Sequence, residues 1–253
     1  MKLLNKVYLF LSPIFIFLIH LPFVFAKTNP DNNFPAQKNQ HQVSFTKAYS
    51  ANTTTSVFDS LKLNSLGLSR EAYDYAVKGF NYLRSLGKLN NDNIISIVDF
   101  SLPSSKKRLF ILDLKNYKIL FNTYVAHGRN SGKDIANQFS NENESYKSSL
   151  GFYVTGDTYM GNHGFSMRLQ GEEKGINDNA NNRAIVMHSA WYVNENIVKS
   201  QGYIGRSQGC PALSEELCKP IIEKIKKGSC LFLYSPDKYY FSHSEILQKI
   251  QAV

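Results

Sequence analysis

The residues with the clearest capacity for chemistry are one cysteine and one histidine, each in a distinctive segment. Cys210 lies in GRSQGCPA (205–212), and His188 ends the apolar run AIVM (184–187). A thiolate attacks carbonyl carbon, and an imidazole beside it can take up the thiol proton. The pair therefore indicates nucleophilic acyl transfer, provided that folding brings the two segments together.

The neighbours of Cys210 fit this chemistry. Pro211 keeps Cys210 out of helical geometry, and Gly209 permits a tight turn in which the N–H groups of Gly209 and Cys210 converge as an oxyanion hole. A helix expected to begin at Ser214 places its positive dipole end a few residues from the sulfur. Taken singly, Cys210 also fits a buried structural thiol, and His188 a core histidine.

The other two cysteines have a different setting. Cys218 falls early in the expected helix, and Cys230 begins the next strand. This arrangement separates their Cα atoms by roughly 10 Å, too far for a disulfide. We expect both to be free, buried thiols that pack as small hydrophobes.

Length, composition and charge indicate an exported, folded protein. The chain has 253 residues, of which 43% are hydrophobic and 13% aromatic. Residues 1–26 join two lysines to an apolar stretch that ends in Val-Phe-Ala, which predicts a signal peptide cleaved after Ala26. An uncleaved membrane anchor is the alternative, although two prolines and a histidine interrupt the stretch. After cleavage we expect no stable membrane span, and a location in the periplasm or cell wall.

The net charge of +9 favours anionic partners. For an exported protein these are wall polymers or lipid headgroups. We expect no nucleic-acid partner, because the chain contains no basic run interleaved with aromatic residues.

The pattern along the chain predicts the domain organisation. Polar residues 27–57 indicate a flexible linker, and 58–92 a helical lead-in, capped by Ser69, that packs on a catalytic domain at 93–253. Runs rich in β-branched and aromatic residues predict strands at 94–100, 108–114, 118–126, 151–156, 164–170, 183–188 and 229–235, with one helix at 214–227.

These elements predict a mainly β fold. Because there is no alternation of strands with helices, we expect an antiparallel β-sandwich or barrel with an N-terminal helix and one helix after the cysteine loop. Two long polar loops, 126–149 and 171–183, flank the strands that lead to His188. We interpret them as walls of a substrate groove.

Several segments together resemble the murein L,D-transpeptidase catalytic domain family, whose cysteine enzymes remodel bacterial peptidoglycan. The resemblance extends from about Ser69 to Tyr234. The segments are VDFS (98–101), KKRLFILDL (106–114), VAHGRNSG (125–132), SSLGFYVTG (148–156), GINDNANNRAIVMHSAWYV (175–193) and GRSQGCPAL (205–213).

The resemblance implies roles for particular residues. Cys210 resembles the nucleophile, His188 the base, and Ser189 the residue whose backbone carbonyl orients the imidazole. Ser207 matches a position that lines the substrate site. The resemblance also implies a β-rich catalytic fold of the L,D-transpeptidase type, murein stem peptides as substrate, inhibition by carbapenems, and neither a metal nor another cofactor.

The cysteine loop departs from the commonest family pattern, Ser-His-Gly-Cys followed by an aliphatic residue and Arg or Asn. Gln208, Pro211 and Ala212 stand at the differing positions. Transpeptidation and hydrolysis by an L,D-carboxypeptidase therefore both remain open. Arg206 suits a substrate carboxylate, such as that of diaminopimelate, by bidentate pairing, although a surface arginine is an equal alternative.

Further residues are candidates for contact with substrate, and two other functions remain open. Gln208, Trp191 and His127 complete the predicted substrate-binding set. A zinc hydrolase would use His127, His163 and His188 with Asp157 or Asp178, but the chain has no recognisable ligand pair. A basic wall-binding module without catalysis would explain the charge and the loops, but not the placing of cysteine and histidine.

Overall fold

The computed structural model describes residues 57–251. The predicted signal peptide (1–26) and the predicted linker (27–57, apart from Val57) lie outside the described residues. The strands are β1 (Ile94–Asp99), β2 (Leu109–Asp113), β3 (Lys118–Thr123), β4 (Gly151–Gly161), β5 (Gly164–Gly171), β6 (Val186–Ser189), β7 (Ala212–Leu213) and β8 (Cys230–Tyr234). The helices are η1 (Leu63–Leu66), α2 (Arg70–Ser85), α3 (Glu195–Gln201), α4 (Glu215–Ile225), α5 (Lys238–His243) and α6 (Glu245–Gln251).

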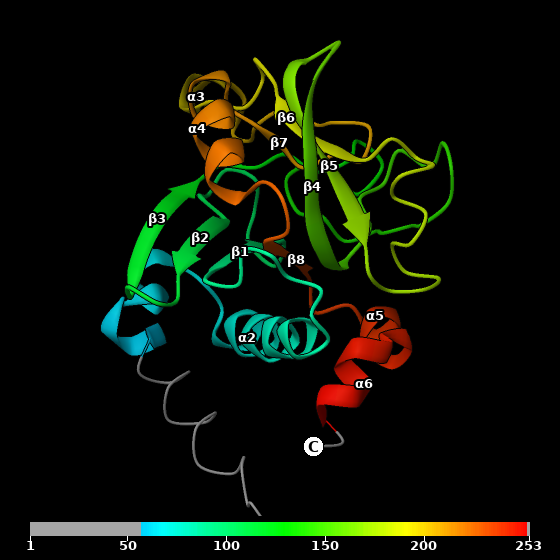
Figure 1. The fold of residues 1–253 in the computed structure, drawn as a ribbon. Helices are drawn as coiled ribbons and strands as arrows, with labels where there is room; N and C mark the ends of the chain where they lie inside the picture. Colours follow the sequence, from blue (N-terminus) through cyan, green and yellow to red (C-terminus); the bar gives the residue numbers. More distant parts are fainter. Residues whose placement is uncertain (1–56, 252–253) are drawn as a thin grey trace, which may run out of the picture. The chain divides into compact units, whose positions relative to one another are not determined.

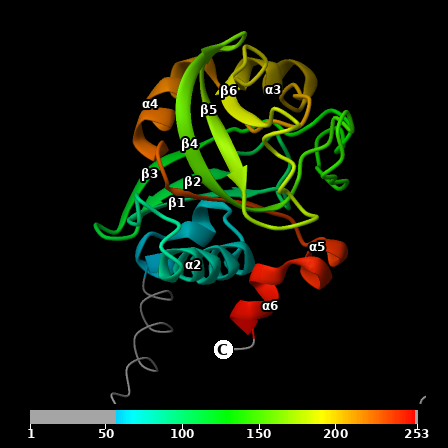
Figure 2. The same cartoon turned by 45° about the vertical axis from the view of Figure 1, so that its right-hand side comes forward.

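The eight strands form one mixed sheet in the order β3-β2-β1-β8-β4-β5-β6-β7 (Figure 1). In the described part of the chain, five pairings are antiparallel, and β1–β8 and β6–β7 are parallel. The β4–β5 hairpin is long and curved (Figure 2), with a register shift between Thr155 and Thr158. The mainly β, mainly antiparallel prediction is confirmed, and the two parallel pairs were not foreseen.

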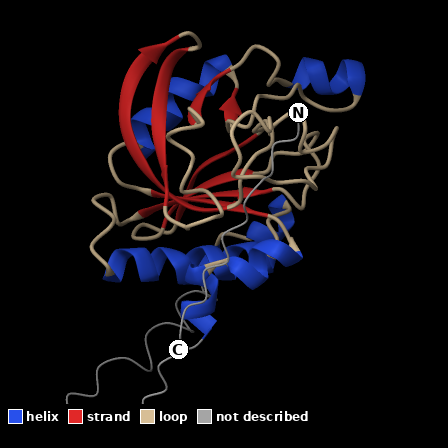
Figure 3. Ribbon diagram, turned by 90° about the vertical axis from the view of Figure 1, so that its right-hand side faces the viewer, coloured by secondary structure: helices blue, strands red, loops and turns tan. Residues whose placement is uncertain are grey.

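Helix α2 covers the central strands β1 and β8 on one side of the sheet, with α6 beside it (Figure 3). It begins where the Ser69 side chain accepts a hydrogen bond from the N–H of Ala72 at 3.2 Å. The N–H of Ser69 in turn donates to the Asp99 carboxylate at 3.0 Å, at the end of β1. Helix α4 packs against β5 and β6.

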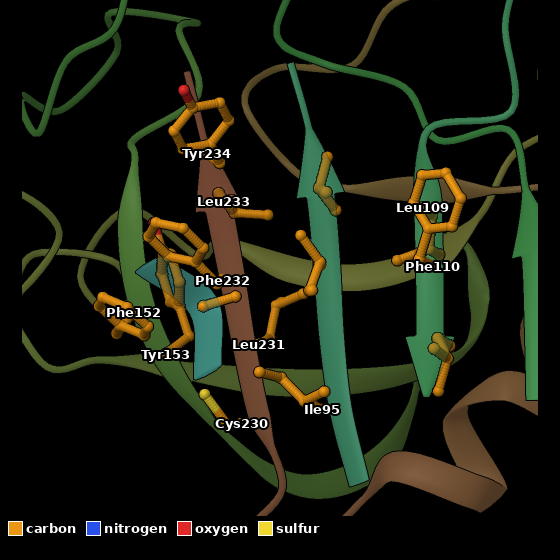
Figure 4. Packing of buried hydrophobic residues seen from close by; sticks show 14 of the residues in the cluster. Ile95, Leu109, Phe110, Phe152, Tyr153, Cys230, Leu231, Phe232, Leu233 and Tyr234 are labelled. Carbon is orange, nitrogen blue, oxygen red and sulfur yellow. The ribbon is translucent and has the colours of Figure 1, made fainter. Parts of the chain in front are cut away.

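The core lies where β8 runs between β1 and β4. Figure 4 shows apolar side chains from all three strands meeting there, among them Ile95, Phe152 and Leu231. Phe152 and Phe232 stack with ring centroids 4.2 Å apart. Gly79 of α2 lies directly on this stack, since a Cβ at this position would come within 2.0 Å of the Phe152 ring.

Replacing Gly79 by alanine is expected to destabilise the fold. The added methyl group must displace a stacked core ring, which costs about 1–3 kcal/mol, more than the roughly 1 kcal/mol of helix propensity gained. Thermal melting checks this, with Lys78→Ala, at an exposed position of the same helix, as the control. A melting temperature of Gly79→Ala at or above that of the wild type would contradict the close packing.

The structure differs from the predicted elements at several edges. Strand β4 extends to Gly161, β6 begins only at Val186, and the short elements β7, α3, α5 and α6 were not predicted. Cys218 and Cys230 are free and buried, as expected. Within residues 57–251, no helix is both long enough and apolar enough to cross a bilayer.

Candidate active site

The parallel pairing of β6 with β7 brings the cysteine and histidine segments together. His188 lies opposite Ala212, and Ser189 opposite Leu213. Cys210 is two residues before Ala212, so the same register places it beside Val186, two residues before His188. Residues two apart on a strand share a face and lie roughly 7 Å apart. The segments that the sequence left 22 positions apart are therefore neighbours.

The Cys210 sulfur contacts the backbone of the segment leading into β6. Its Sγ lies 3.5 Å from the N–H of Val186 and 3.7 Å from the carbonyl oxygen of Ala184. Burial raises the pKa of the thiol, against the opposing effects of the Val186 N–H and the Arg183 charge. In this conformation the thiol makes no hydrogen bond with His188.

The imidazole of His188 is buried and held in one orientation. Its Nδ1 lies 2.8 Å from the carbonyl oxygen of Ser189, so Nδ1 carries the proton and donates. This leaves the lone pair on Nε2, which has no partner among the described residues. Burial lowers the pKa of His188, and the neighbouring His163 lowers it further. The imidazole is therefore neutral at neutral pH and able to accept a proton.

The turn before Cys210 is closed by Ser207. The Ser207 hydroxyl donates to the carbonyl oxygen of Cys210 at 2.6 Å and accepts from the N–H of Gly209 at 3.1 Å. The Gly209 N–H expected in an oxyanion hole is therefore already bonded in this conformation. The N–H of Cys210 bonds to no other residue within the described chain, and it contacts its own sulfur.

The loop 126–149 packs against this turn. Gly128 bridges to Ser207 in parallel fashion, and the Ser148 hydroxyl donates to the carbonyl oxygen of Gly209 at 3.1 Å. Gly209 has φ +123°, and a Cβ there would lie 2.8 Å from the carbonyl oxygen of Lys147. Only glycine fits this close approach of two backbones.

The other predicted contact residues lie around the turn, mostly exposed. Arg206 and Gln208 flank Ser207 and are exposed. The Arg206 guanidinium donates to the carbonyl oxygen of Gly132 at 3.3 Å, which draws it toward the loop 126–149. Trp191 follows β6, is 68% exposed, and meets Tyr192 edge to face. Arg206, Gln208 and Trp191 can therefore be reached from solvent, whereas Ser207 is buried between Arg206 and Gln208.

His127 is not a surface group of the groove, because its side chain is completely buried. Its Nδ1 accepts from the Arg108 guanidinium at 2.7 Å, and its Nε2 donates to the carbonyl oxygen of Gly132 at 3.1 Å. Both nitrogens are thus occupied, and a substrate would find no free atom on the ring. Burial and the Arg108 charge lower the pKa of His127 from 6.5 to about 4. We therefore do not retain His127 as a substrate contact.

The buried His127 is expected to make folding stability fall with acidity. Since the folded pKa is about 4 and the ordinary value 6.5, the unfolded chain binds the proton more tightly. Stability is lost as pH falls from 6.5 to 4, by about 3 kcal/mol in total. In His127→Gln, whose amide replaces both hydrogen bonds, this loss is absent.

Urea unfolding between pH 7 and 4 measures the effect. His243→Gln, at an exposed position of α5, is the control for the loss of a histidine as such. Equal pH slopes for wild type and His127→Gln would show that folding does not lower the pKa of His127.

The zinc alternative finds no support in the arrangement of side chains. Within residues 57–251, no three His, Cys, Asp or Glu side chains are grouped so that they could hold a metal ion. His163 lies against His188 with ring centroids 4.5 Å apart, whereas His127 is bonded to Arg108.

The model of the L,D-transpeptidase catalytic domain family matches residues 64–234, most of the chain. The chain belongs to this family. The match includes every residue singled out above for the site, and it begins near the Ser69 from which the resemblance was traced. No curated protein matches the chain.

Solved structures similar to this L,D-transpeptidase domain include three bacterial proteins. An L,D-transpeptidase from Mycobacterium smegmatis is 13% identical, with TM-score 0.35 over 56% of this chain and 59% of that one. An L,D-transpeptidase from Stackebrandtia nassauensis is 13% identical, with TM-score 0.35, covering 67% and 69%. The helical cell shape determining protein Pgp2 from Campylobacter jejuni is 13% identical, with TM-score 0.40, covering 73% and 62%. The chain thus spans about six tenths of the length of the first of these.

Three residues near the site were not among the predicted catalytic and substrate-binding residues, although His163 was named in the zinc alternative. Arg183 lies beside the turn, and His163 stacks on His188. Burial raises the pKa of Tyr192 to about 12, and a negative charge on Cys210 would raise it further. Arg183 and Tyr192 stand in segments already quoted for the resemblance, which was the only signal for them. His163 lies in the β4–β5 turn, and its partner is 25 residues away.

The structure explains why Ala212 stands where the commonest family pattern has Arg or Asn. Its side chain is completely buried in a small apolar cluster with Ala126, Ala190, Val193 and Ile204. An Arg or Asn at this position, as in the commonest family pattern, would place an unpaired polar group there.

Proposed function

We propose that this protein is an exported peptidoglycan-remodelling cysteine acyltransferase, which acts on murein stem peptides through a thioacyl-enzyme. The observation that supports this most directly is the β6–β7 pairing, which sets the Cys210 turn beside the strand that carries His188. Membership of the L,D-transpeptidase catalytic domain family supports the choice of peptidoglycan as substrate.

The resting pair is a neutral thiol and a neutral imidazole. Burial raises the pKa of Cys210 and lowers that of His188, so the proton moves during attack and not before it. Sγ leaves the Ala184 carbonyl by rotation about Cα–Cβ and gives its proton to Nε2 of His188. The sulfur electron pair forms the bond to the carbonyl carbon on the L-side of the scissile bond.

The tetrahedral intermediate carries its charge on the former carbonyl oxygen. The N–H of Cys210 donates to it, joined by that of Gly209 once Gly209 exchanges its bond to Ser207 for one to the oxyanion. Collapse breaks the C–N bond, and His188 returns its proton to the departing amine. A terminal D-amino acid leaves, and an amine or water then resolves the thioester.

The exposed rim of the turn supplies the contacts to substrate. The Arg206 guanidinium pairs with a stem-peptide carboxylate, and Gln208 and Trp191 contact the peptide or the sugar. Ser207 keeps the turn in shape beneath them. The predicted signal peptide directs the chain to the periplasm or cell wall, where this substrate lies.

Incubation of the purified protein with a murein tetrapeptide, followed by mass spectrometry, tests the proposal. Release of the terminal D-amino acid together with a new peptide bond to an added amine is the expected result. Release without bond formation would assign an L,D-carboxypeptidase. Binding to peptidoglycan with no release would leave the wall-binding module.

A further inference from the structure

Arg183 lies between the loop 126–149 and the cysteine turn, just before β6. Its Nη1 donates to the carbonyl oxygen of Ser140 at 2.8 Å and to the hydroxyl of Ser149 at 2.7 Å. Its Nη2 donates to the carbonyl oxygen of Lys147 at 2.6 Å and to the hydroxyl of Ser145 at 3.2 Å. The Arg183 side chain thus makes hydrogen bonds to four residues of the loop.

All four acceptors of Arg183 are neutral. No carboxylate forms an ion pair with this guanidinium in the part of the chain that the structure describes. The side chain is nevertheless only partly exposed, and this burial lowers the pKa of Arg183. A partly buried cation without a counter-ion is costly unless hydrogen bonds or a nearby anion compensate it, and here the four acceptors supply hydrogen bonds but no negative charge.

The neighbouring group is Cys210. A Cβ at Gly209 would lie 3.4 Å from Nη2 of Arg183, so the guanidinium lies close beside the residue before the cysteine. The Cys210 sulfur contacts the carbonyl oxygen of Ala184, the residue after Arg183. Ala184 has φ +51°, an uncommon backbone conformation for a non-glycine residue, as expected at a functional turn.

We propose that Arg183 is a positioning residue of the site, whose guanidinium holds the loop 140–149 on the cysteine turn and supplies the fixed positive charge that stabilises the Cys210 thiolate. The inference rests on the proposed function only in taking Cys210 as the nucleophile. When the S–H bond breaks, the proton passes to His188, the sulfur keeps the electron pair, and Arg183 stays protonated throughout.

Other titratable groups around the sulfur do not provide this charge. Burial raises the pKa of Tyr192 to about 12 and also raises that of Tyr153, so both phenols stay neutral. The lowered pKa of His188 keeps the imidazole neutral until it takes the thiol proton. Among the described residues, Arg183 is the cation whose charge lowers the pKa of the Cys210 thiol.

Alkylation of Cys210 by iodoacetamide, followed by mass spectrometry between pH 6 and 11, tests the proposal. Arg183→Gln is expected to raise the midpoint of the pH profile by about one unit, which makes alkylation at pH 7 roughly tenfold slower. Arg183→Lys keeps a charge and is expected to shift the midpoint by about a quarter as much. Ser149→Ala removes one acceptor but keeps the guanidinium, and leaves the midpoint unchanged.

A folded Arg183→Gln with the wild-type midpoint would overturn the proposal. If this variant does not fold, Arg183→Lys decides, because a rise of a full unit there would show that the guanidinium geometry matters and its charge does not. Iodoacetamide needs neither peptidoglycan nor acyl transfer. A failure of the proposed function therefore appears in the tetrapeptide assay and leaves the alkylation profile intact.

Discussion

Cys210→Ala is expected to abolish the covalent adduct of the protein with a carbapenem and to reduce release of the D-amino acid by about 10⁴-fold or more. The physical reason is that this thiol alone lies on a turn at the edge of the sheet. Cys218 and Cys230 are buried in the core, where burial raises the pKa of Cys218 to about 11 and that of Cys230 further. Intact-mass spectrometry after incubation with the carbapenem provides the measurement.

Cys218→Ala is the matched control for this experiment. It removes a thiol of the same size from α4, away from the turn, and is expected to retain one adduct per chain. An adduct that persists in Cys210→Ala would place the nucleophile elsewhere. Peptidoglycan effects that persist without an adduct would favour the wall-binding module.

His188→Gln is expected to lower kcat/KM for the tetrapeptide by about 10²–10⁴-fold at neutral pH, the usual contribution of a general base. The amide still donates to the Ser189 carbonyl, so the variant preserves the local hydrogen bond and removes only the titratable nitrogen. Because the resting Cys210 is a thiol, hydroxide can replace the base at high pH. The deficit is therefore expected to shrink as the pH approaches 10.

His163→Phe separates the chemistry of His188 from its packing. The phenyl ring preserves the stack on His188 but carries no charge, and the loss of activity is expected to be only a few-fold. A His188→Gln activity within threefold of the wild type at pH 7 would exclude His188 as the base. A pH-independent deficit would indicate a purely structural contribution of His188.

The strands illustrate what local sequence can predict. Residues 94–99, 109–113 and 230–234 are rich in β-branched, aliphatic and aromatic residues, and each segment forms a buried strand. Local sequence does not predict their order in the sheet, because β8, near the C-terminal end of the described chain, lies between β1 and β4. Strand β7 has two residues, Ala212 and Leu213, and depends on tertiary partners: it pairs with β6 on one side, and Ala212 bridges to Ala126 on the other.

In the site too, local sequence identifies candidate residues but not their contacts. Cys210 and His188 are visible in the sequence because each ends or interrupts a pattern. Their approach depends on pairing between β6 and β7, and the contacts of Arg183 come from residues 34 to 43 positions away. His127 was expected to face the groove because a polar residue after a strand resembles a loop residue, whereas the structure buries its side chain completely beside the equally buried Arg108.

The backbone cradle of the Cys210 sulfur has a consequence for the lifetime of the enzyme. Oxidation of cysteine proceeds through the thiolate and follows solvent exposure. A half-buried sulfur that rests as a thiol against Val186 and Ala184 offers oxidants little thiolate, because burial raises its pKa. Cys210 is therefore expected to stay reduced at rest, although it pairs with no other cysteine of the described chain, and to react when its sulfur moves away from this backbone.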